Sequence, residues 1–304
     1  MLVTDLKALG NDLMDWLDGK LLDSQLFSDY PFLATTSFIK KITKKNPKDP
    51  LLLQVLPQLS ELEAVPGFVS DPVGESSCSP VAGLIHKYPD RVLLLASDTC
   101  AINCRFCFRR HLRTPVANWP LVFNYLKQHL EVKEVILSGG DPLMLNDGLL
   151  GNVFDELSLI KHLKRLRIHT RLPIVAPELV NPKVLNVGLK AVMVVHCNHP
   201  SEIDDEVIKI IRAIRNQGLV IYNQSVLLKG VNDNVEVLVD LSEKLFAAGV
   251  FPYYLHLLDK VSGAAHFYVG VSEARVIYDL LKSRLSGYLV PKLVRDYQQG
   301  KIYL

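Results

Sequence analysis

The chain lacks several features that would place it in particular classes of protein. Nowhere in its 304 residues does an apolar run approach the roughly 18 residues needed to cross a bilayer. The formal net charge of +2 is too small to indicate nucleic acid or an anionic membrane as the main partner. Asp5, Asp12, Asp15 and Asp18 interrupt the stretch where a secretory signal would need an unbroken apolar segment. We therefore expect a soluble cytoplasmic protein.

Cysteine is also scarce, and it is unevenly placed. Of the five cysteines, Cys78 and Cys197 stand apart, whereas Cys100, Cys104 and Cys107 follow one another with the spacing C-x-x-x-C-x-x-C. An odd count and a tight cluster argue against a disulfide framework. In a reducing compartment such a cluster favours metal binding.

What the chain has in quantity is hydrophobic residues, which make up 49% of it and can build a large core. Short β-rich runs alternate with segments of helical spacing, and this pattern predicts a parallel sheet with helices outside it. The six runs are 91–96, 134–137, 165–169, 191–196, 220–227 and 253–257. Because a closed barrel has eight strands, six predict an α/β fold with a partial (β/α)6 barrel.

Three parts of the chain follow from this pattern. Residues 1–85 are expected to form a helical and irregular extension, which opens with an amphipathic helix over residues 2–23. The barrel is expected over residues 86–290, and a short C-terminal tail over residues 291–304.

Polar residues stand at or just after the ends of these runs. Since the carboxyl ends of barrel strands form one face, we expect these side chains to converge on one pocket. In chain order they are Cys100, Cys104, Cys107, Ser138, Gly139, Gly140, Asp141, Arg171, His196, Asn198, His199, Asn223, Gln224 and Asp259.

The cysteine spacing allows more than one kind of site. Three thiolates on a four-iron cluster leave one iron free to bind another molecule. The alternatives are a zinc site completed by a histidine such as His111, or three inert buried cysteines. Zinc ribbons usually carry a second C-x-x-C pair, which this chain lacks. The spacing, on the loop after the first predicted strand, resembles the signature of the radical S-adenosylmethionine superfamily. That resemblance implies a 4Fe-4S cluster that cleaves S-adenosylmethionine.

The glycine loop that follows the second predicted strand supports the same interpretation. Ser138-Gly139-Gly140-Asp141 is similar to a Gly-Gly-Glu type motif of the superfamily, with Asp141 in place of the glutamate. Glycines at this point let the backbone approach a ligand closely, although a simple turn would have the same composition. The resemblance implies contact with the amino group of the methionine moiety.

A longer resemblance covers the chain from about residue 66 to its end. Several segments, in order, resemble the lysine 2,3-aminomutase family and within it the branch that serves elongation factor P. They are residues 86–92, 104–110, 138–143, 167–173, 223–228, 252–266 and 286–291. The resemblance implies an isomerase that uses the cluster, S-adenosylmethionine and pyridoxal phosphate.

In that family an adenosyl radical removes a β-hydrogen from L-α-lysine, and the amino group then migrates to give β-lysine. The implied partners are L-lysine, a reductant protein and, indirectly, elongation factor P with its lysyl ligase, with no role for nucleic acid or membranes. Self-association into a homo-oligomer is a further possibility. The alternatives are a catabolic lysine or other amino-acid 2,3-aminomutase, a radical enzyme without pyridoxal phosphate, and a non-enzymatic iron–sulfur or zinc protein.

The resemblance also implies roles for individual residues. Lys301 is the candidate Schiff-base lysine, against the alternative of an exposed tail lysine. Arg109 is the candidate for the substrate carboxylate, because a planar guanidinium binds a carboxylate through two hydrogen bonds. Asp259 and Asp296 match positions that hold the side-chain ammonium of the substrate.

Further cofactor contacts are implied less directly. Lys87 and Arg91 are candidates for the cofactor phosphate, with surface ion pairs as the alternative. His196, Asn198 and Gln224 are candidates for the adenosyl moiety, with buried structural hydrogen bonds as the alternative. The glycine-rich segment before Lys301 is shorter than in many family members, and cysteines near the C-terminus are missing. Both departures favour the factor-modifying branch over the catabolic one.

Overall fold

The computed structural model describes residues 1–4, 30–111, 116–297 and 300–304. In this part of the chain a nine-stranded sheet has the order β11-β10-β9-β8-β7-β6-β5-β4-β3. Its strands are β3 (Leu84–Tyr88), β4 (Arg91–Ser97), β5 (Glu134–Gly139), β6 (Arg165–Thr170), β7 (Lys190–His196), β8 (Val220–Leu227), β9 (Phe251–Leu257), β10 (Lys292–Tyr297) and β11 (Gly300–Tyr303). Strands β4 to β10 run parallel, and β3 and β11 are antiparallel edges.

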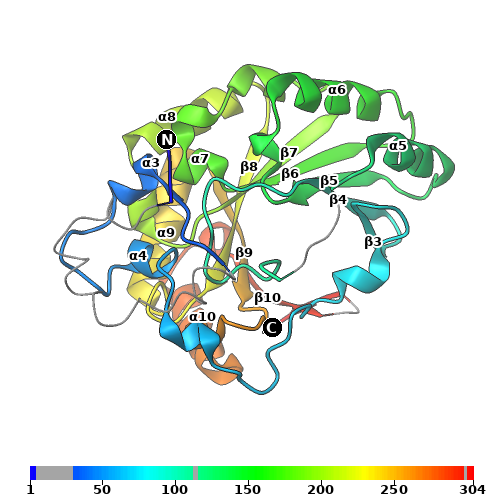
Figure 1. Ribbon diagram of the computed structural model, residues 1–304. Helices are drawn as coiled ribbons and strands as arrows, with labels where there is room; N and C mark the ends of the chain where they lie inside the picture. Colours follow the sequence, from blue (N-terminus) through cyan, green and yellow to red (C-terminus); the bar gives the residue numbers. More distant parts are fainter. Residues whose placement is uncertain (5–29, 112–115, 298–299) are drawn as a thin grey trace.

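Helices cover the outer side of this curved sheet, as Figure 1 shows for α5, α6 and α8. The longer ones are α5 (Trp119–Gln128), α6 (Asp147–Ser158), α8 (Asp205–Arg215), α9 (Val235–Ala248) and α10 (Val271–Arg284). Single-turn helices α3 (Thr36–Ile39), α4 (Pro50–Leu53) and α7 (Leu172–Val175) lie with the small antiparallel pair of β1 (Leu2–Val3) and β2 (Ala34–Thr35) at one side of the barrel.

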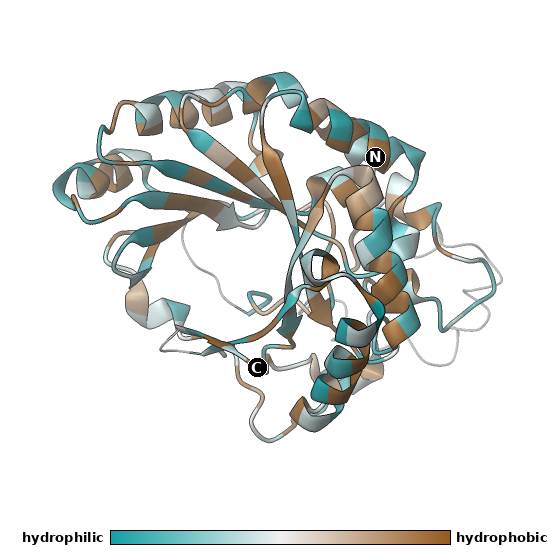
Figure 2. Cartoon of the chain, turned by 180° about the vertical axis from the view of Figure 1, so that it is seen from behind, coloured by the Kyte–Doolittle hydropathy of each residue, from teal (hydrophilic) through white to brown (hydrophobic). Residues whose placement is uncertain are grey.

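Local sequence explains where the helices begin and which face they bury. Asp204 caps α8 by accepting a hydrogen bond from the backbone N–H of Val207 at 3.0 Å. The buried residues of α8 are Val207, Ile211 and Ile214, at the spacing of one helical face. Helix α9 ends at Gly249, whose φ of 87° is a left-handed conformation that suits glycine. Figure 2 shows the hydrophobic residues on the strands and the inward faces of the helices.

All six predicted strands are present, and the partial barrel is confirmed. The sheet nevertheless extends beyond the prediction at both edges, because β3 precedes the first predicted strand and residues 292–303 form β10 and β11. The expected C-terminal tail is therefore part of the sheet. The physical reason is burial, since Leu293 and Val294 are 2% and 0% exposed and pack as core residues of a seventh parallel strand.

The two edges of the sheet meet and nearly close the barrel. Lys87, in β3, donates hydrogen bonds to the carbonyl oxygens of Val73, at 3.1 Å, and of Tyr297, at the end of β10. A Cβ atom on Gly300, whose φ is 134°, would stand 3.4 Å from Oη of Tyr88. The start of β11 therefore lies against the end of β3, and glycine permits this close approach.

Two predictions concern the N-terminal part. The amphipathic helix expected over residues 2–23 falls almost wholly outside the described residues, and its first two residues, Leu2 and Val3, form β1 rather than helix. None of the helices in the described part of the chain is long and apolar enough to cross a bilayer.

Candidate functional site

The three clustered cysteines lie on the loop that follows β4. All three are free thiols of intermediate exposure. They lie close enough to influence one another, because burial raises the pKa of Cys107 and the neighbouring Cys104 raises it further. Each thiolate of a four-iron cluster binds a different iron, so the sulfurs need not point at one centre. The loop thus fits a cluster with three protein ligands.

The zinc alternative fits less well. Among the described residues, no group of three or more His, Cys, Asp or Glu side chains is spaced to hold a single metal ion. His111, the proposed fourth ligand, is exposed, and its Nε2 lies 2.9 Å from the carbonyl oxygen of Ser262. Its ring is therefore used elsewhere.

A buried arginine holds a positive charge beside the cysteines. Nη1 of Arg171 donates to Sγ of Cys104 at 2.7 Å, and Nη2 donates to Oε2 of Glu202 at 2.9 Å and to Oε1 of Gln54 at 2.6 Å. Arg171 is 7% exposed. A fixed guanidinium beside a thiol stabilises the thiolate form, which is the form that binds iron.

The glycine loop packs directly against the cysteine loop. A Cβ on Gly139, whose φ is 111°, would stand 2.5 Å from the carbonyl oxygen of Ser97, and one on Gly140 would stand 2.4 Å from that of Thr99. Only glycine fits at these two points. Their role in holding two loops together is visible here, and their contact with S-adenosylmethionine stays a prediction.

Asp141 is engaged within the protein. Its buried carboxylate accepts hydrogen bonds from the backbone N–H groups of Leu143, Arg171 and Leu172 and from the hydroxyl of Thr170. These bonds tie the glycine loop to the end of β6, so Asp141 positions the loops around it. A direct contact with the methionine amino group also stays a prediction.

Arg109 lies beside the glycine loop and is held by a glutamate that the sequence analysis missed. Its Nε and Nη2 donate to the two carboxylate oxygens of Glu75, at 2.7 and 2.6 Å. Its Nη1 donates to Oγ of Ser138 at 3.0 Å. Nη1 also donates to the carbonyl oxygen of Gly139 at 3.4 Å, so the second N–H of Nη2 is the donor left for another acceptor. Arg109 is therefore not the surface arginine of the alternative interpretation.

Lys301 is also partly buried, unlike the exposed tail lysine of the alternative interpretation. Its side chain is 21% exposed, and its Nζ lies 3.4 Å from Oδ2 of Asp296 and 3.3 Å from Nε2 of His256. The ammonium stands 4.1 Å from the centre of the Tyr254 ring. Burial lowers the pKa of Lys301, against the opposing charge of Asp296. An amine of this kind is more reactive toward a carbonyl group than an exposed lysine.

The two aspartates proposed for the substrate ammonium differ in their surroundings. Burial raises the pKa of Asp259 to about 7, and the charge of Asp296 adds to the shift. Burial also acts to raise the pKa of Asp296, but the hydrogen bond from His256 and the charge of Lys301 outweigh it and hold that pKa at about 2. Within the described part of the chain, the Asp259 side chain has no hydrogen-bond or ion-pair partner. The charges of Lys301 and Arg295 offset the rise of its pKa only in part, so Asp259 is an acid without a contacting counter-ion.

The residues proposed for the cofactor phosphate are occupied elsewhere. Lys87 donates to the carbonyl oxygen of Tyr297 across the closing edge of the barrel and to that of Val73 in the segment before β3. Arg91 lies 3.8 Å over the ring of Tyr88 and pairs with Asp90 at 2.9 Å. The ion pair of the alternative interpretation is therefore present for Arg91, and the phosphate role of both residues stays a prediction.

The three candidates for the adenosyl moiety also differ. Asn198 is fully buried and hydrogen-bonds Gln54 at 3.0 Å and the backbone N–H of Val226 at 2.9 Å, as the structural alternative expected. Gln224 lies beside His196 in the register of β7 and β8. Nε2 of His196 is buried with no hydrogen-bond partner among the described residues. Because such an orphaned atom is costly, it points to a ligand.

A second orphaned atom lies at the same end of the sheet. Nε2 of His169 is buried without a partner in the described chain. Burial lowers the pKa of His169, and the charges of Arg167, Lys301 and Arg109 lower it further. These groups therefore face one interior. His169 and His256, which the sequence analysis passed over, stand inside predicted strands, where polar residues at inward positions were the available signal.

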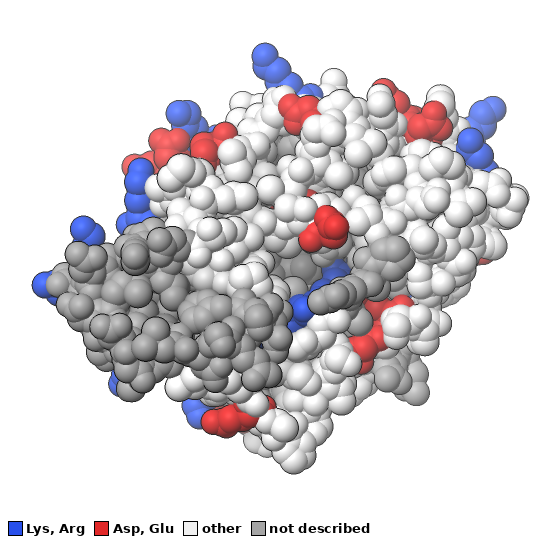
Figure 3. Space-filling view, in the orientation of Figure 1, with Lys and Arg blue, Asp and Glu red and all other residues white. Residues whose placement is uncertain are grey.

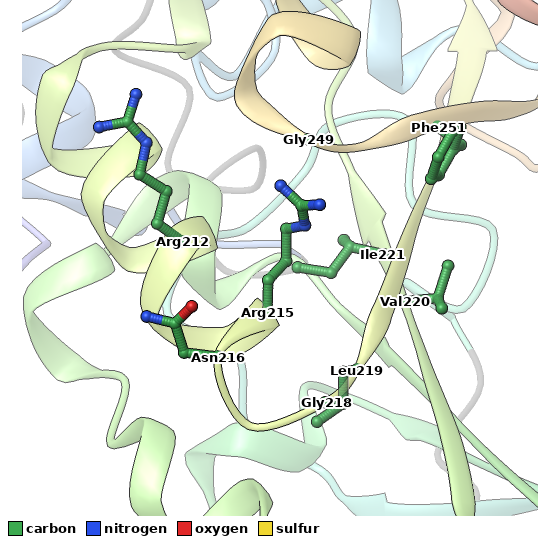
Figure 4. A pocket seen from close by; sticks show the side chains of 9 residues that line it. All are labelled: Arg212, Arg215, Asn216, Gly218, Leu219, Val220, Ile221, Gly249 and Phe251. Carbon is green, nitrogen blue, oxygen red and sulfur yellow. The ribbon is translucent and has the colours of Figure 1, made fainter.

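The surface of the protein has two hollows. Figure 3 shows one near the middle of the face in view, where basic and acidic side chains meet. Figure 4 shows another, a pocket of about 330 Å³ whose lining includes Arg212, Arg215 and Phe251. This pocket adjoins the first residues of β8 and β9, opposite the ends that carry the cysteine loop and Asp259, and it contains none of the predicted site residues.

Comparisons with known proteins agree with this site. Residues 94–241 match the model of the radical SAM superfamily. The chain is 47% identical to an L-lysine 2,3-aminomutase of Haemophilus influenzae, over 85% of this chain and 79% of the relative. It is 48% identical to one of Escherichia coli, over 86% and 78%. A radical SAM methyltransferase from Sphaerobacter thermophilus shares the fold, with a TM-score of 0.50 and 17% identity over 70% of this chain and 68% of that one. The chain therefore belongs to the L-lysine 2,3-aminomutase family of the radical SAM superfamily.

Proposed function

We propose that the protein is an isomerase that converts L-α-lysine into β-lysine. The observation that carries the proposal is the arrangement of charge inside the barrel. Arg109 offers a donor for a carboxylate, Asp259 offers an acid without a contacting partner in the described chain, and the amine of Lys301 lies 3.4 Å from Asp296. A free amino acid with a cationic side chain matches this pattern of charge.

The cysteine loop supplies the radical chemistry. Cys100, Cys104 and Cys107 would hold a 4Fe-4S cluster, which would supply the electron for cleavage of S-adenosylmethionine. The protein keeps the thiols close together, and Arg171 provides a positive charge beside Cys104. The unpartnered Nε2 atoms of His196 and His169 offer hydrogen-bonding groups to the bound molecules.

The C-terminal strands suit a second cofactor. Pyridoxal phosphate supplies a carbonyl carbon that binds amines and supports migration of the amino group. Lys301 is the amine placed to bind it, because its Nζ lies in the barrel beside Asp296 and burial lowers its pKa. The ring of Tyr254 lies beside its Nζ. Lys87 and Arg91 are the cations proposed for the phosphate, and each would exchange its present partners for that role.

Substrate choice follows from the acids. Asp259 and Asp296 together favour a cationic side chain over an anionic one such as that of glutamate. Arg109, held by Glu75 and Ser138, would bind the substrate carboxylate through its remaining N–H group. By holding the substrate at both ends, these residues would fix the position of the reacting carbon inside the barrel.

We further propose that β-lysine made here is attached to elongation factor P by a lysyl ligase. The segments that resemble the factor-modifying branch support this assignment. A protein reductant must reduce the cluster, and clustered free thiols suit a reducing compartment such as the cytoplasm. Self-association stays a prediction.

The test is an anaerobic assay with lysine, S-adenosylmethionine, pyridoxal phosphate and a chemical reductant, in which β-lysine is measured by mass spectrometry. We expect β-lysine only when all components are present and iron and sulfide occur in equal amounts. Zinc without sulfide would contradict the cluster. Faster turnover of glutamate than of lysine would contradict the roles of the two aspartates.

Lys301→Ala separates the proposed enzyme from a radical enzyme without pyridoxal phosphate. We expect the variant to keep its iron, to cleave S-adenosylmethionine slowly, and to lose β-lysine formation together with the visible absorbance of bound cofactor. Exposed Lys209→Ala on α8 serves as the matched control. Retention of that absorbance in Lys301→Ala would contradict the assignment of Lys301.

A further inference from the structure

Three side chains on three neighbouring strands form a continuous polar chain. Nδ1 of His256, on β9, lies 3.2 Å from Oδ2 of Asp296, on β10. Nε2 of the same ring lies 3.3 Å from Nζ of Lys301, on β11. The strand register explains the meeting, because Val294 pairs with His256 and Asp296 pairs with Lys301. Paired and alternate residues point to one face of a sheet, so all three side chains share a face.

The partners determine which ring nitrogen carries the proton. A lysine ammonium only donates hydrogen bonds, so Nε2 of His256 must accept from Lys301. An ionised carboxylate only accepts, so Nδ1 of His256 must carry hydrogen and donate to Asp296. Burial favours the neutral ring, since it lowers the pKa of His256 more than the hydrogen bond to Asp296 raises it.

Lys301 needs such an anchor because its own strand is weakly placed. Strand β11 contains four residues and lies at the edge of the sheet. A lysine side chain loses considerable rotamer freedom when it is held in one position. The Nζ–Oδ2 distance of 3.4 Å to Asp296 is long for a charged hydrogen bond, so the amine depends on this contact together with His256 at 3.3 Å and the ring of Tyr254 at 4.1 Å.

We propose that His256 is a positioning residue for Lys301, held in its Nδ1–H form by Asp296 and keeping the Lys301 amine inside the barrel through Nε2. The inference rests on the proposed function, in which Lys301 binds pyridoxal phosphate. It adds a residue with no assigned role and gives Asp296 a second one, since that carboxylate orients the histidine as well as facing the substrate ammonium. His256 is not required to touch substrate or cofactor.

Two substitutions of His256 separate hydrogen bonding from packing. His256→Leu removes both hydrogen bonds and keeps a side chain of similar size. His256→Gln retains an acceptor for Lys301 and a donor for Asp296 at about the reach of the ring. His129→Leu, at the half-buried residue that follows α5, is the matched control. Iron content and the thermal unfolding temperature verify that each variant is folded.

The first readout needs no cofactor. Accessible amines of the whole protein are acetylated at a series of pH values, and mass spectrometry follows the extent at Lys301. For His256→Leu we expect acetylation of Lys301 to be about tenfold faster than in the wild type, because loss of one charged hydrogen bond releases the side chain. His256→Gln and His129→Leu should stay near the wild-type rate.

The second readout traps pyridoxal phosphate on Lys301 with borohydride. We expect the trapping rate to fall about tenfold in His256→Leu and to be largely restored in His256→Gln. Unchanged acetylation in His256→Leu, or equal defects in both variants, would overturn the positioning role. If wild-type protein shows protected Lys301 but traps no pyridoxal phosphate, the proposed cofactor fails while the role of His256 in holding the amine stands.

Discussion

The region around the cysteines and the region around Lys301 differ in how their charges are paired. Beside the cysteine loop, Glu61 binds both Arg105 and Arg110, and Glu202 binds Arg171, all with nearly complete burial. Beside Lys301, by contrast, Asp259 has no partner in the described part of the chain, and Asp296 shares one oxygen between His256 and Lys301.

This difference separates a region whose charges are already paired within the protein from a region that would bind a charged ligand. Buried ion pairs with several hydrogen bonds hold a loop in one arrangement, as a cluster site requires. An acid with a raised pKa and no counter-ion is unfavourable unless a cationic ligand repays its burial. We therefore regard the cysteine side as a preformed frame, held by its buried ion pairs. On the Lys301 side, we expect the positive charge of the substrate to pair with Asp259. Three substitutions test this distinction.

The largest effect is expected at the frame. Glu61→Gln leaves two buried arginines without a counter-charge, so the free energy of unfolding should fall by roughly 3 to 5 kcal/mol. Denaturant unfolding under anaerobic conditions measures it. Glu236→Gln, in an exposed pair with Arg284, is the control and should cost less than about 1 kcal/mol. Equal effects of the two substitutions would mean that the cysteine loop does not depend on its buried pairs.

A smaller effect is expected for Glu75, which holds the proposed carboxylate-binding Arg109 in place. Glu75→Gln weakens the anchor of Arg109, so KM for lysine should rise about tenfold while kcat changes less. Steady-state kinetics give the split, and exposed Glu63→Gln in the same segment is the control. A lower KM would show instead that Glu75 competes with the substrate carboxylate.

The smallest change in the free energy of unfolding is expected for Asp259→Asn. This substitution should stabilise the protein, whereas Glu61→Gln should destabilise it. The pKa of Asp259 rises from 3.8 to about 7 on folding, so the penalty is absent below pH 4 and grows as pH approaches 7. Asp259→Asn should therefore stabilise the protein at pH 7 by on the order of 1 kcal/mol, with no gain near pH 4.

The same variant should lose most of its turnover of lysine, because the ammonium loses its acid. Unfolding curves at the two pH values and the β-lysine assay check both halves of this prediction. A variant that is no more stable at pH 7 would indicate that the Asp259 carboxyl is well hydrated and is not waiting for a counter-ion.

Much of the fold could be predicted from local patterns. The spacing of Val207, Ile211 and Ile214 identified α8, and short β-rich runs identified β4 to β9, because helix and strand periodicities are set by neighbouring residues. The cysteine spacing identified the cluster loop for the same reason. The edge strands escaped prediction, since Leu293 and Val294 are recognised as core only once β9 lies beside them.

The sequence by itself thus determined the strand order of the barrel, the cysteine loop and the polar residues at the strand ends. Only the tertiary structure decided how those residues are paired. It joined Glu75 to Arg109, placed His256 between Asp296 and Lys301, and left Asp259 without a contacting partner among the described residues. The physical reason is range, because secondary structure and motif spacing depend on nearby residues. Charge pairing depends on the register of strands and loops that lie farther apart, 34 residues for Glu75 and Arg109 and 45 for His256 and Lys301.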